Sequence, residues 1–347
     1  MPRRARRRRA VTAPLRWGVL GAASIAVRRV IPAMQRSAAC RVDAIASRDL
    51  AKARAAADAL GIPRAYGSYE ELLADPEIDA VYNPLPNHLH VPWSERAAAA
   101  GKHVLCEKPI ALTADEARAL VAARDRAGVQ IAEAFMVRTH PQWHVARDVV
   151  RSGRIGELKL VTGHFSYHRR DPSDVRNRVE WGGGVLLDVG CYPITMSRWL
   201  FGAEPAEVVG TLERDPEFGV DRLAAGLLRF PTGMATFGVG GQIVHHQRVQ
   251  ILGTAGRIEL EIPFSPPGDH PTRLLVDDGR DVLGTGVESI AVGAYDQFTL
   301  QADRFAAAVR GEGPVPVPLE DAIANMAVID AIFRSVESGR WESPAAS

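Results

Sequence analysis

The feature that most constrains the fold is a regular alternation of strand and helix patterns before residue 136. Short apolar runs typical of strands fall at residues 15–20, 41–46, 79–82, 102–105 and 130–135. Helical patterns lie between them at residues 27–34, 50–60 and 88–100, and capping boxes at 68–71 (SYEE) and 113–116 (TADE) open two further helices. This spacing is typical of βαβ units, so we predict a doubly wound parallel sheet with helices on both faces.

A different pattern begins near residue 153. Residues 158–167 alternate apolar and polar, and further strand candidates follow at 208–212, 223–230, 234–239, 248–252 and 257–262. Turn sequences at 230–234 (FPTGM) and 253–256 (GTAG) are typical of hairpins. Helices are predicted at 186–201, 296–309 and 319–338. The second half is therefore predicted to be an α/β domain with a mostly antiparallel sheet.

The length of 347 residues exceeds what one hydrophobic core usually serves, so we predict two domains. We place a dinucleotide-binding domain at residues 14–137 and a substrate-binding and oligomerisation domain at 138–347. Residues 1–13 are predicted to be a disordered basic tail, because they hold six arginines and no acid. A twin-arginine export signal would need an apolar segment after the arginines, and residues 17–26 are needed for the first strand.

The bulk composition excludes several classes of function. A net charge of +1 gives no electrostatic basis for binding nucleic acid or an anionic membrane. No apolar run reaches the roughly 18 residues of a membrane helix. Cys40, Cys106 and Cys191 are scattered in apolar runs, which indicates buried thiols in a reducing cytoplasm and no zinc site. We therefore expect a cytoplasmic protein without a metal.

The first strand leads into a turn that is suited to a dinucleotide. Residues 18–26 (GVLGAASIA) place Gly21, Ala23 and Ala26 at the three small positions of G-x-G-x-x-G. The phosphates would lie at the N-terminus of the next helix, where free amides favour an anion. We predict cofactor contacts from Gly21, Ala22, Ala23, Ser24 and Ile25.

The end of the second strand indicates which dinucleotide binds. NAD is usually held by an acid there, but this strand ends in Ser47 and Arg48, which suit the 2′-phosphate of NADP. Asp49 follows, and we expect it to cap the next helix, although NAD stays possible. Two later strand ends supply further predicted cofactor contacts, namely Pro84, Leu85, Pro86, Asn87, His90, Glu107 and Lys108.

The segment GGGVLLDVGCYPI at residues 182–194 combines three glycines with a polar pair in an apolar helix. Asp188 and Tyr192 are four residues apart, which places them on one helical face. One interpretation is a functional acid and phenol. The other is a buried tyrosine that is hydrogen-bonded to a helix-capping aspartate.

Together these motifs resemble the Gfo/Idh/MocA family of NAD(P)-dependent sugar oxidoreductases. The resemblance rests on GVLGAASIA, ASRD, NPLPNHLH, the triplet EKP at 107–109, EAFMVR at 133–138 and GGGVLLDVGCYP. It implies a Rossmann domain followed by an α/β domain with an open antiparallel sheet, and a substrate bound between them. Lys108 matches the family's catalytic lysine, and Tyr192 matches a position where many members have His.

Members with tyrosine at that position are similar to glucose–fructose oxidoreductase, dihydrodiol dehydrogenase, D-xylose dehydrogenase and ketoreductases of nucleotide-linked deoxysugars. This branch favours NADP, in agreement with Ser47 and Arg48. Thr195 replaces an aspartate of the histidine branch, which argues against myo-inositol as the substrate.

The resemblance implies a mechanism in which Tyr192 donates or accepts a proton. A nearby Lys108 ammonium would lower the pKa of the phenol, and Asp188 would hydrogen-bond either the sugar or Lys108. Arg176 would bind a substrate diphosphate or face solvent. The substrate would be a free aldose or a nucleotide-linked 3-keto-deoxysugar.

Two further expectations concern assembly and activity. A one-sided antiparallel sheet leaves a face to cover, so we expect a homo-oligomer, either a dimer or a tetramer. The alternative to an enzyme is a Rossmann-fold NADP sensor or structural protein that binds the cofactor without turnover.

Overall fold

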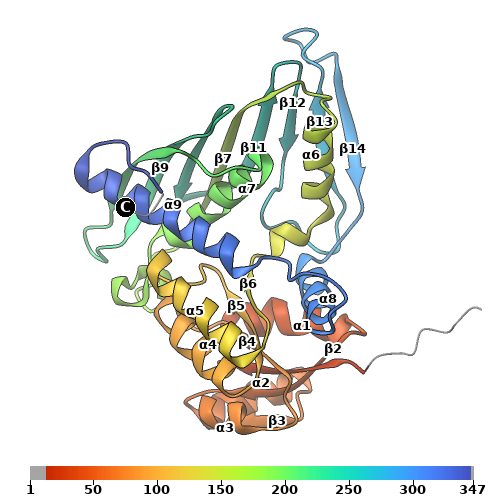
Figure 1. Ribbon diagram of the computed structural model, residues 1–347, viewed down its shortest axis with the longest axis vertical. Helices are drawn as coiled ribbons and strands as arrows, with labels where there is room; N and C mark the ends of the chain where they lie inside the picture. Colours follow the sequence, from red (N-terminus) through yellow and green to blue (C-terminus); the bar gives the residue numbers. More distant parts are fainter. Residues whose placement is uncertain (1–12, 345–347) are drawn as a thin grey trace, which may run out of the picture.

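The computed structural model describes residues 13–344 and contains two sheets, one above the other in Figure 1. The lower sheet has the strand order β3-β2-β1-β4-β5-β6, and all its pairs are parallel. Its strands are β1 (Leu15–Leu20), β2 (Cys40–Ala46), β3 (Arg64–Tyr66), β4 (Ala80–Asn83), β5 (His103–Glu107) and β6 (Ile131–Ala134). The order reverses between β1 and β4, which is where ligands bind in such sheets. The predicted doubly wound sheet is confirmed.

Helices cover both faces of this sheet. They are the π-helical turn η1 (Ala26–Val30), α1 (Ile31–Arg36), α2 (Leu50–Leu60), α3 (Tyr69–Ala74), α4 (His90–Ala99) and α5 (Ala114–Ala127). Both predicted capping boxes are confirmed, because Ser68 Oγ accepts from the Glu71 amide and Thr113 Oγ1 from the Glu116 amide, at 3.1 and 3.2 Å. The helix predicted at 27–34 is instead a π-helical turn followed by a short α-helix.

The upper sheet has the order β14-β13-β12-β11-β7-β10-β9-β8. Its strands are β7 (Leu158–His168), β8 (Glu207–Arg214), β9 (Asp221–Arg229), β10 (Met234–Gly240), β11 (Gln242–Gly253), β12 (Arg257–Leu260), β13 (Thr272–Asp277) and β14 (Val287–Val292). Only the β7–β10 pair is parallel, so the mostly antiparallel prediction is confirmed. Both predicted hairpin turns close with backbone hydrogen bonds.

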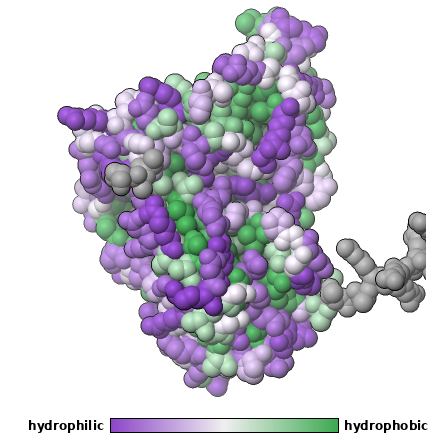
Figure 2. All heavy atoms as spheres, in the orientation of Figure 1, coloured by the Kyte–Doolittle hydropathy of each residue, from purple (hydrophilic) through white to green (hydrophobic). Residues whose placement is uncertain are grey.

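One face of the upper sheet packs against α6 (Pro141–Arg151), the π-helical turn η6 (Leu186–Gly190), α7 (Cys191–Phe201) and α9 (Leu319–Ser338) (Figure 1). In β10, Ala235, Phe237 and Val239 are buried on that face, whereas Met234 on the other face is 40% exposed. Hydrophilic residues predominate on the side of the molecule seen in Figure 2, with hydrophobic areas near its centre and top.

Helix α8 (Gln297–Val309) follows the upper sheet in the chain but packs on the lower one. The rings of Phe305 and Trp17 in β1 are 5.3 Å apart between centroids, and Thr299 donates to the Ala33 carbonyl at 3.0 Å. Pro318 then pairs with Ala132 at the edge of β6. The segment predicted as a second domain thus contributes a helix to the core of the first, and the boundaries at 137 and 138 stay a prediction.

No helix in residues 13–344 is long and apolar enough to cross a membrane. The predicted basic tail at 1–13 lies almost wholly outside the described residues.

Phe305→Ala should lower the free energy of unfolding by about 3–5 kcal/mol, because it opens a cavity against Trp17 in the first core. Phe218→Ala in a surface turn should cost about 1 kcal/mol or less. Urea unfolding of both variants gives the comparison, and similar losses would show that α8 is not part of that core.

Candidate active site

A cavity of ≈ 1080 Å³ runs along the carboxyl ends of the parallel strands and reaches the upper sheet. Every residue predicted to contact the cofactor lines it, namely Gly21, Ala22, Ala23, Ser24, Ile25, Ser47, Arg48, Pro84, Leu85, Pro86, Asn87, His90, Glu107 and Lys108. Arg176, Asp188 and Tyr192 line the same cavity. The structure thus brings all the predicted site residues together, although their roles stay predictions.

The turn after β1 has the geometry that a dinucleotide needs. Gly21 has φ +96°, and its amide donates to the Ala46 carbonyl at 2.7 Å. A Cβ at Gly21 would lie 3.0 Å from the Leu85 side chain, so the bare backbone keeps the turn close to the cavity. Arg28 and Arg29 of η1 also line the cavity and were not predicted.

The end of β2 fits a phosphate better than a ribose hydroxyl. The Asp49 carboxylate accepts from the amides of Ala51 and Lys52, at 3.0 and 3.3 Å, and so caps α2 as predicted. The exposed cations Arg48 and Lys52 line the cavity beside Ser47. Two cations and a hydroxyl suit the 2′-phosphate of NADP.

Several predicted cofactor residues are held by the protein itself. Asn87 Nδ2 donates to the Gly182 carbonyl at 2.8 Å, which joins the first domain to the glycine run. The two ring nitrogens of His90 lie 2.7 Å from the carbonyl oxygens of Pro109 and Leu85. Burial lowers the pKa of His90 to about 4, and the neutral ring has one N–H, so it can donate to only one of these two carbonyls.

Two buried carboxyls support the loop that carries Lys108. The Tyr82 hydroxyl donates to Glu107 at 2.6 Å, and the Ile110 amide donates to Glu133 at 2.9 Å. Burial raises the pKa of Glu107, and it raises the pKa of Glu133 to about 8.

Lys108 reaches from the end of β5 to the helix of the second domain. Its Nζ lies 2.9 Å from Asp188 Oδ1, donates to the Asp188 carbonyl, and lies 5.1 Å from the centroid of the Tyr192 ring. Burial opposes the charge of Lys108, but the Asp188 carboxylate together with Tyr192 and Cys191 holds the pKa of Lys108 above its usual value. Lys108 is therefore a fixed cation.

Asp188 is the centre of the polar cluster. Its Oδ2 accepts from the Tyr167 hydroxyl and from Arg176 Nε, both at 2.7 Å. Burial opposes ionisation, but Arg176 and Lys108 outweigh it and hold the pKa of Asp188 well below its usual range. The predicted contact of Asp188 with Lys108 is present, and its contact with a sugar stays a prediction. Arg176 is paired with Asp188 and Asp174 while its side chain is 39% exposed, and its two predicted roles stay predictions.

Tyr192 lies in an aromatic pocket and is 4% exposed. The rings of Phe135, Phe165 and Phe264 lie 4.8–5.5 Å from its centroid, and its hydroxyl is 3.6 Å from Met136 Sδ. Burial raises the pKa of Tyr192, and Lys108 only partly offsets it. The expectation that the ammonium lowers this pKa toward working pH is wrong for the structure without ligands. The alternative of a tyrosine bonded to a capping aspartate is also wrong, because Asp188 accepts from Tyr167.

The three glycines are required by protein contacts. A Cβ at Gly182 would lie 2.2 Å from Leu112, one at Gly183 2.6 Å from the Arg176 carbonyl, and one at Gly184 2.0 Å from Asp221. They line the cavity as expected, but each also passes against another part of the chain. The run therefore packs the first turn of the site helix against both domains.

Sequence reasoning missed Tyr167, Met136 and Phe165, which line the same cavity. The alternation in residues 158–167 would have placed Phe165 and Tyr167 in a strand without showing that its end reaches the site. Among residues 13–344, no group of three or more His, Cys, Asp or Glu side chains is arranged to hold a metal ion.

A parallel sheet with a dinucleotide turn, joined to a second domain that presents a tyrosine beside a lysine, defines a two-domain nicotinamide-dependent oxidoreductase. The chain belongs to the Gfo/Idh/MocA family. Residues 15–135 match the model of the oxidoreductase family with an NAD-binding Rossmann fold, and residues 143–259 match a GFO/IDH/MocA C-terminal domain.

Relatives of known activity are similar over nearly the whole chain. An NADP⁺ D-xylose 1-dehydrogenase of Haloferax volcanii is 42% identical over 93% of this chain and 98% of its own. A dTDP-3,4-didehydro-2,6-dideoxy-α-D-glucose 3-reductase of Streptomyces violaceoruber is 39% identical over 86% of each chain. The crystal structure of a 3-ketoreductase from Actinomadura kijaniata with NADP and TDP-benzene superposes with a TM-score of 0.87 at 32% identity, over 92% of this chain and 97% of that one.

Arg48→Ala should weaken NADPH binding about 10- to 100-fold and leave NADH binding nearly unchanged, because a phosphate loses a charged partner. Arg54→Ala, on the exposed surface of α2, should change neither affinity. Fluorescence titration measures both affinities for the parent protein and for each variant, and equal affinity of the parent protein for NADPH and NADH would contradict the assignment.

Proposed function

We propose that this protein is an NADP-dependent oxidoreductase that moves a hydride between the nicotinamide and a carbon of a sugar or sugar derivative. The observation that carries the proposal is the contact of Lys108 with Asp188 and with the ring of Tyr192, at the point where the dinucleotide cavity meets the second domain.

The residues that would hold NADP are the turn at Gly21–Ile25, the pair Ser47 and Arg48, and the loops at 84–90 and 107–108. The cofactor, when bound, supplies the hydride acceptor or donor. The fit is supported by the cations at the end of β2 and by the Asp49 carboxylate being engaged as a helix cap.

Tyr192 is the proton donor or acceptor in this proposal. Its raised pKa keeps the phenol protonated at neutral pH, so it is ready to donate to the oxygen of a carbonyl that is being reduced. In the oxidative direction the phenol must first release its own proton to solvent, and the phenolate then accepts the proton of the sugar hydroxyl while the hydride leaves the carbon. The Lys108 ammonium, held charged by Asp188, stabilises the negative charge that develops on the same oxygen.

A free aldose is the substrate class that the contacts favour. The arginines of the segment before the glycines are already paired: Arg169 with Asp174, Arg170 with Glu217, Arg176 with Asp188, and Arg178 with Glu180. A nucleotide-linked sugar would need at least one of them to leave its carboxylate and bind the diphosphate. The similarity to D-xylose dehydrogenase supports the same choice.

The cytoplasmic location and the homo-oligomer remain part of this proposal. The exposed face of the upper sheet, with Met234 and Leu223 at 40% and 39% exposure, supports an association of copies. A cofactor sensor without turnover remains the alternative, and it requires that Lys108 and Tyr192 be dispensable.

Tyr192→Phe should lower the rate of hydride transfer about 10²–10⁴-fold, because it removes the proton and keeps the ring. Lys108→Met should lower the rate at least as much. The rate loss of the double variant should be far smaller than the product of the two single losses, since the two groups act as a unit. Single-turnover absorbance of NADPH measures each rate, and NADPH binding to Tyr192→Phe should be unchanged.

Tyr66→Phe is the matched control, because it removes a hydroxyl that is bonded to Asp75, away from the cavity. Near-normal turnover by Tyr192→Phe would show that the phenol is only a core group, and the sensor would then be favoured.

A substrate panel tests the sugar class. Two rates are compared: the oxidation of D-xylose and other free aldoses by NADP⁺, and the reduction of dTDP-linked 3-keto-sugars by NADPH. The first should be faster. The opposite order, together with a rise in KM for the dTDP-linked sugar in Arg176→Lys, would assign the nucleotide-linked class instead.

A further inference from the structure

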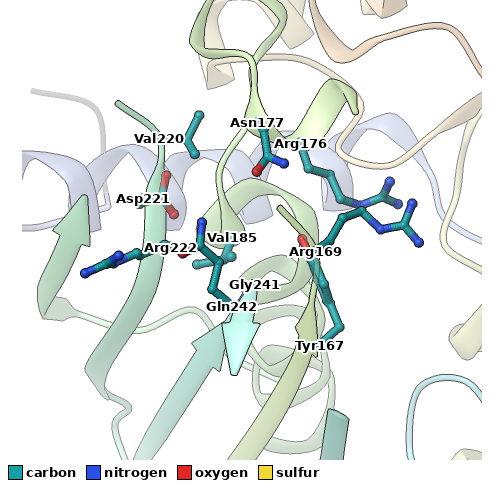
Figure 3. A pocket seen from close by; sticks show the side chains of 10 residues that line it. All are labelled: Tyr167, Arg169, Arg176, Asn177, Val185, Val220, Asp221, Arg222, Gly241 and Gln242. Carbon is teal, nitrogen blue, oxygen red and sulfur yellow. The ribbon is translucent and has the colours of Figure 1, made fainter. Parts of the chain in front are cut away.

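Asp221 is a buried carboxylate that the proposed chemistry does not use. It lies at the start of β9 and is 3% exposed. Its side chain borders a small cavity of ≈ 10 Å³, enough for about one water molecule. Figure 3 shows Asp221 and Arg222 on one side of this cavity and Arg176, Arg169 and Tyr167 on the other.

The carboxylate holds the first turn of the helix that carries the site. Asp221 Oδ2 accepts from the Leu186 amide at 2.7 Å, and Leu186 is the first residue of η6. Amides at a helix start have no partner within the helix, so this one needs an external acceptor. Gly184 has φ +112°, and its missing Cβ leaves the space that Asp221 Oδ1 fills.

The same turn leads directly to the catalytic cluster. The Asp188 amide donates to the Gly184 carbonyl at 3.1 Å, and Asp188 is held on its other side by Tyr167 and Arg176. These last two residues form the opposite wall of the small cavity. Asp221 and Asp188 thus fix one short segment from two directions.

We propose that Asp221 is a positioning residue, whose ionised carboxylate fixes the turn at 184–186 and thereby aims Asp188 and Tyr192 at the reacting oxygen. This role rests on the proposed function of Tyr192.

Burial disfavours the ionised form of Asp221, and hydrogen bonding favours it. Burial raises the pKa of Asp221 to about 6, although the Leu186 amide favours the charged form. A carboxyl whose folded pKa is raised loses folding stability as the pH rises from its unfolded value near 4 through about 6. Replacing the carboxylate with a neutral amide should therefore not destabilise the protein at neutral pH. Replacing a carboxylate that only stabilised the fold would instead lower the stability of the protein at neutral pH.

The charged groups that face Asp221 are Arg214 of β8, Arg222 of β9, and Arg169 and Arg176 across the cavity. Nearby Asp174, Asp188 and Asp215 have lowered pKa values, and Tyr167 has a raised one. The exposed imidazole of His168 lies opposite Gln242 in the β7–β11 register, so His168→Gln is included as a control.

Asp221→Asn is the decisive variant, tested with D-xylose or the panel sugar that turns over fastest. The parent kcat should fall on the acid side with an apparent pKa of about 6. The variant should lack this acid limb and show a kcat about tenfold lower at pH 8, because the site is misaligned. Its Tm at pH 8 should equal or exceed that of the parent, and NADPH affinity should be unchanged.

Asp215→Asn is the matched control, since Asp215 is also buried at the β8–β9 hairpin but accepts from Gln242 at 2.6 Å. It should keep the acid limb and the kcat. Hydrogen exchange of the peptide 182–192 gives a readout that needs no substrate. Its protection, corrected for intrinsic rates, should fall below pH 6 in the parent and at all pH values in Asp221→Asn.

Retention of both kcat and the acid limb in Asp221→Asn would overturn the role, as would a loss of activity that only follows a lower Tm. If Asp221→Asn does not fold, Gly184→Ala is tested in its place, because its methyl group would displace the Asp221 carboxylate. Normal kcat and normal hydrogen exchange in Gly184→Ala would also overturn the positioning role. Near-normal turnover by Tyr192→Phe would instead refute the proposed function. A normal Asp221→Asn beside an inactive Tyr192→Phe would refute only the positioning role.

Discussion

The ion pair between Lys108 and Asp188 is the interaction on which the arrangement of the site depends. The two side chains come from different domains and are only 12% and 14% exposed. Removing one partner from a buried pair typically costs about 3–5 kcal/mol, because the other charge is left without compensation. Arg176 and Tyr167 satisfy the second oxygen of Asp188, so the carboxylate stays ionised and the ammonium stays charged. The charge that the proposed chemistry would use therefore also joins the two domains.

Much of the fold could be predicted because its signals are local. The βαβ alternation, the two capping boxes and the two hairpin turns are each encoded within a few residues. The elements that escaped lack such signals. β3 has three half-buried residues at a sheet edge, β14 exposes five of its six positions at least partly, and α6 is capped by His140 in place of the usual Ser, Thr, Asp or Asn. The placement of α8 on the first core depends on Phe305 meeting Trp17, almost 290 residues away in sequence, which no local pattern encodes.

The site residues likewise divide into those with a local sequence signal and those without one. Lys108, Asp188 and Tyr192 were found through motifs that lie in single short segments. Tyr167 and the pairing of Arg176 with Asp188 were not foreseen, because both depend on contacts to Asp188 from a strand end and a loop. The pKa of Tyr192 could not be judged from sequence, because the three phenylalanines that desolvate it come from three distant segments. His90 lines the cavity as predicted, but its ring is engaged with two backbone carbonyls, which is a tertiary effect.

The return of the chain to the first sheet through α8 and Pro318 limits how the molecule can move. Here the chain crosses between the two sheets three times, after β6, before α8 and before α9 (Figure 1). Three separate crossings leave fewer motions of one sheet relative to the other than a single linker would.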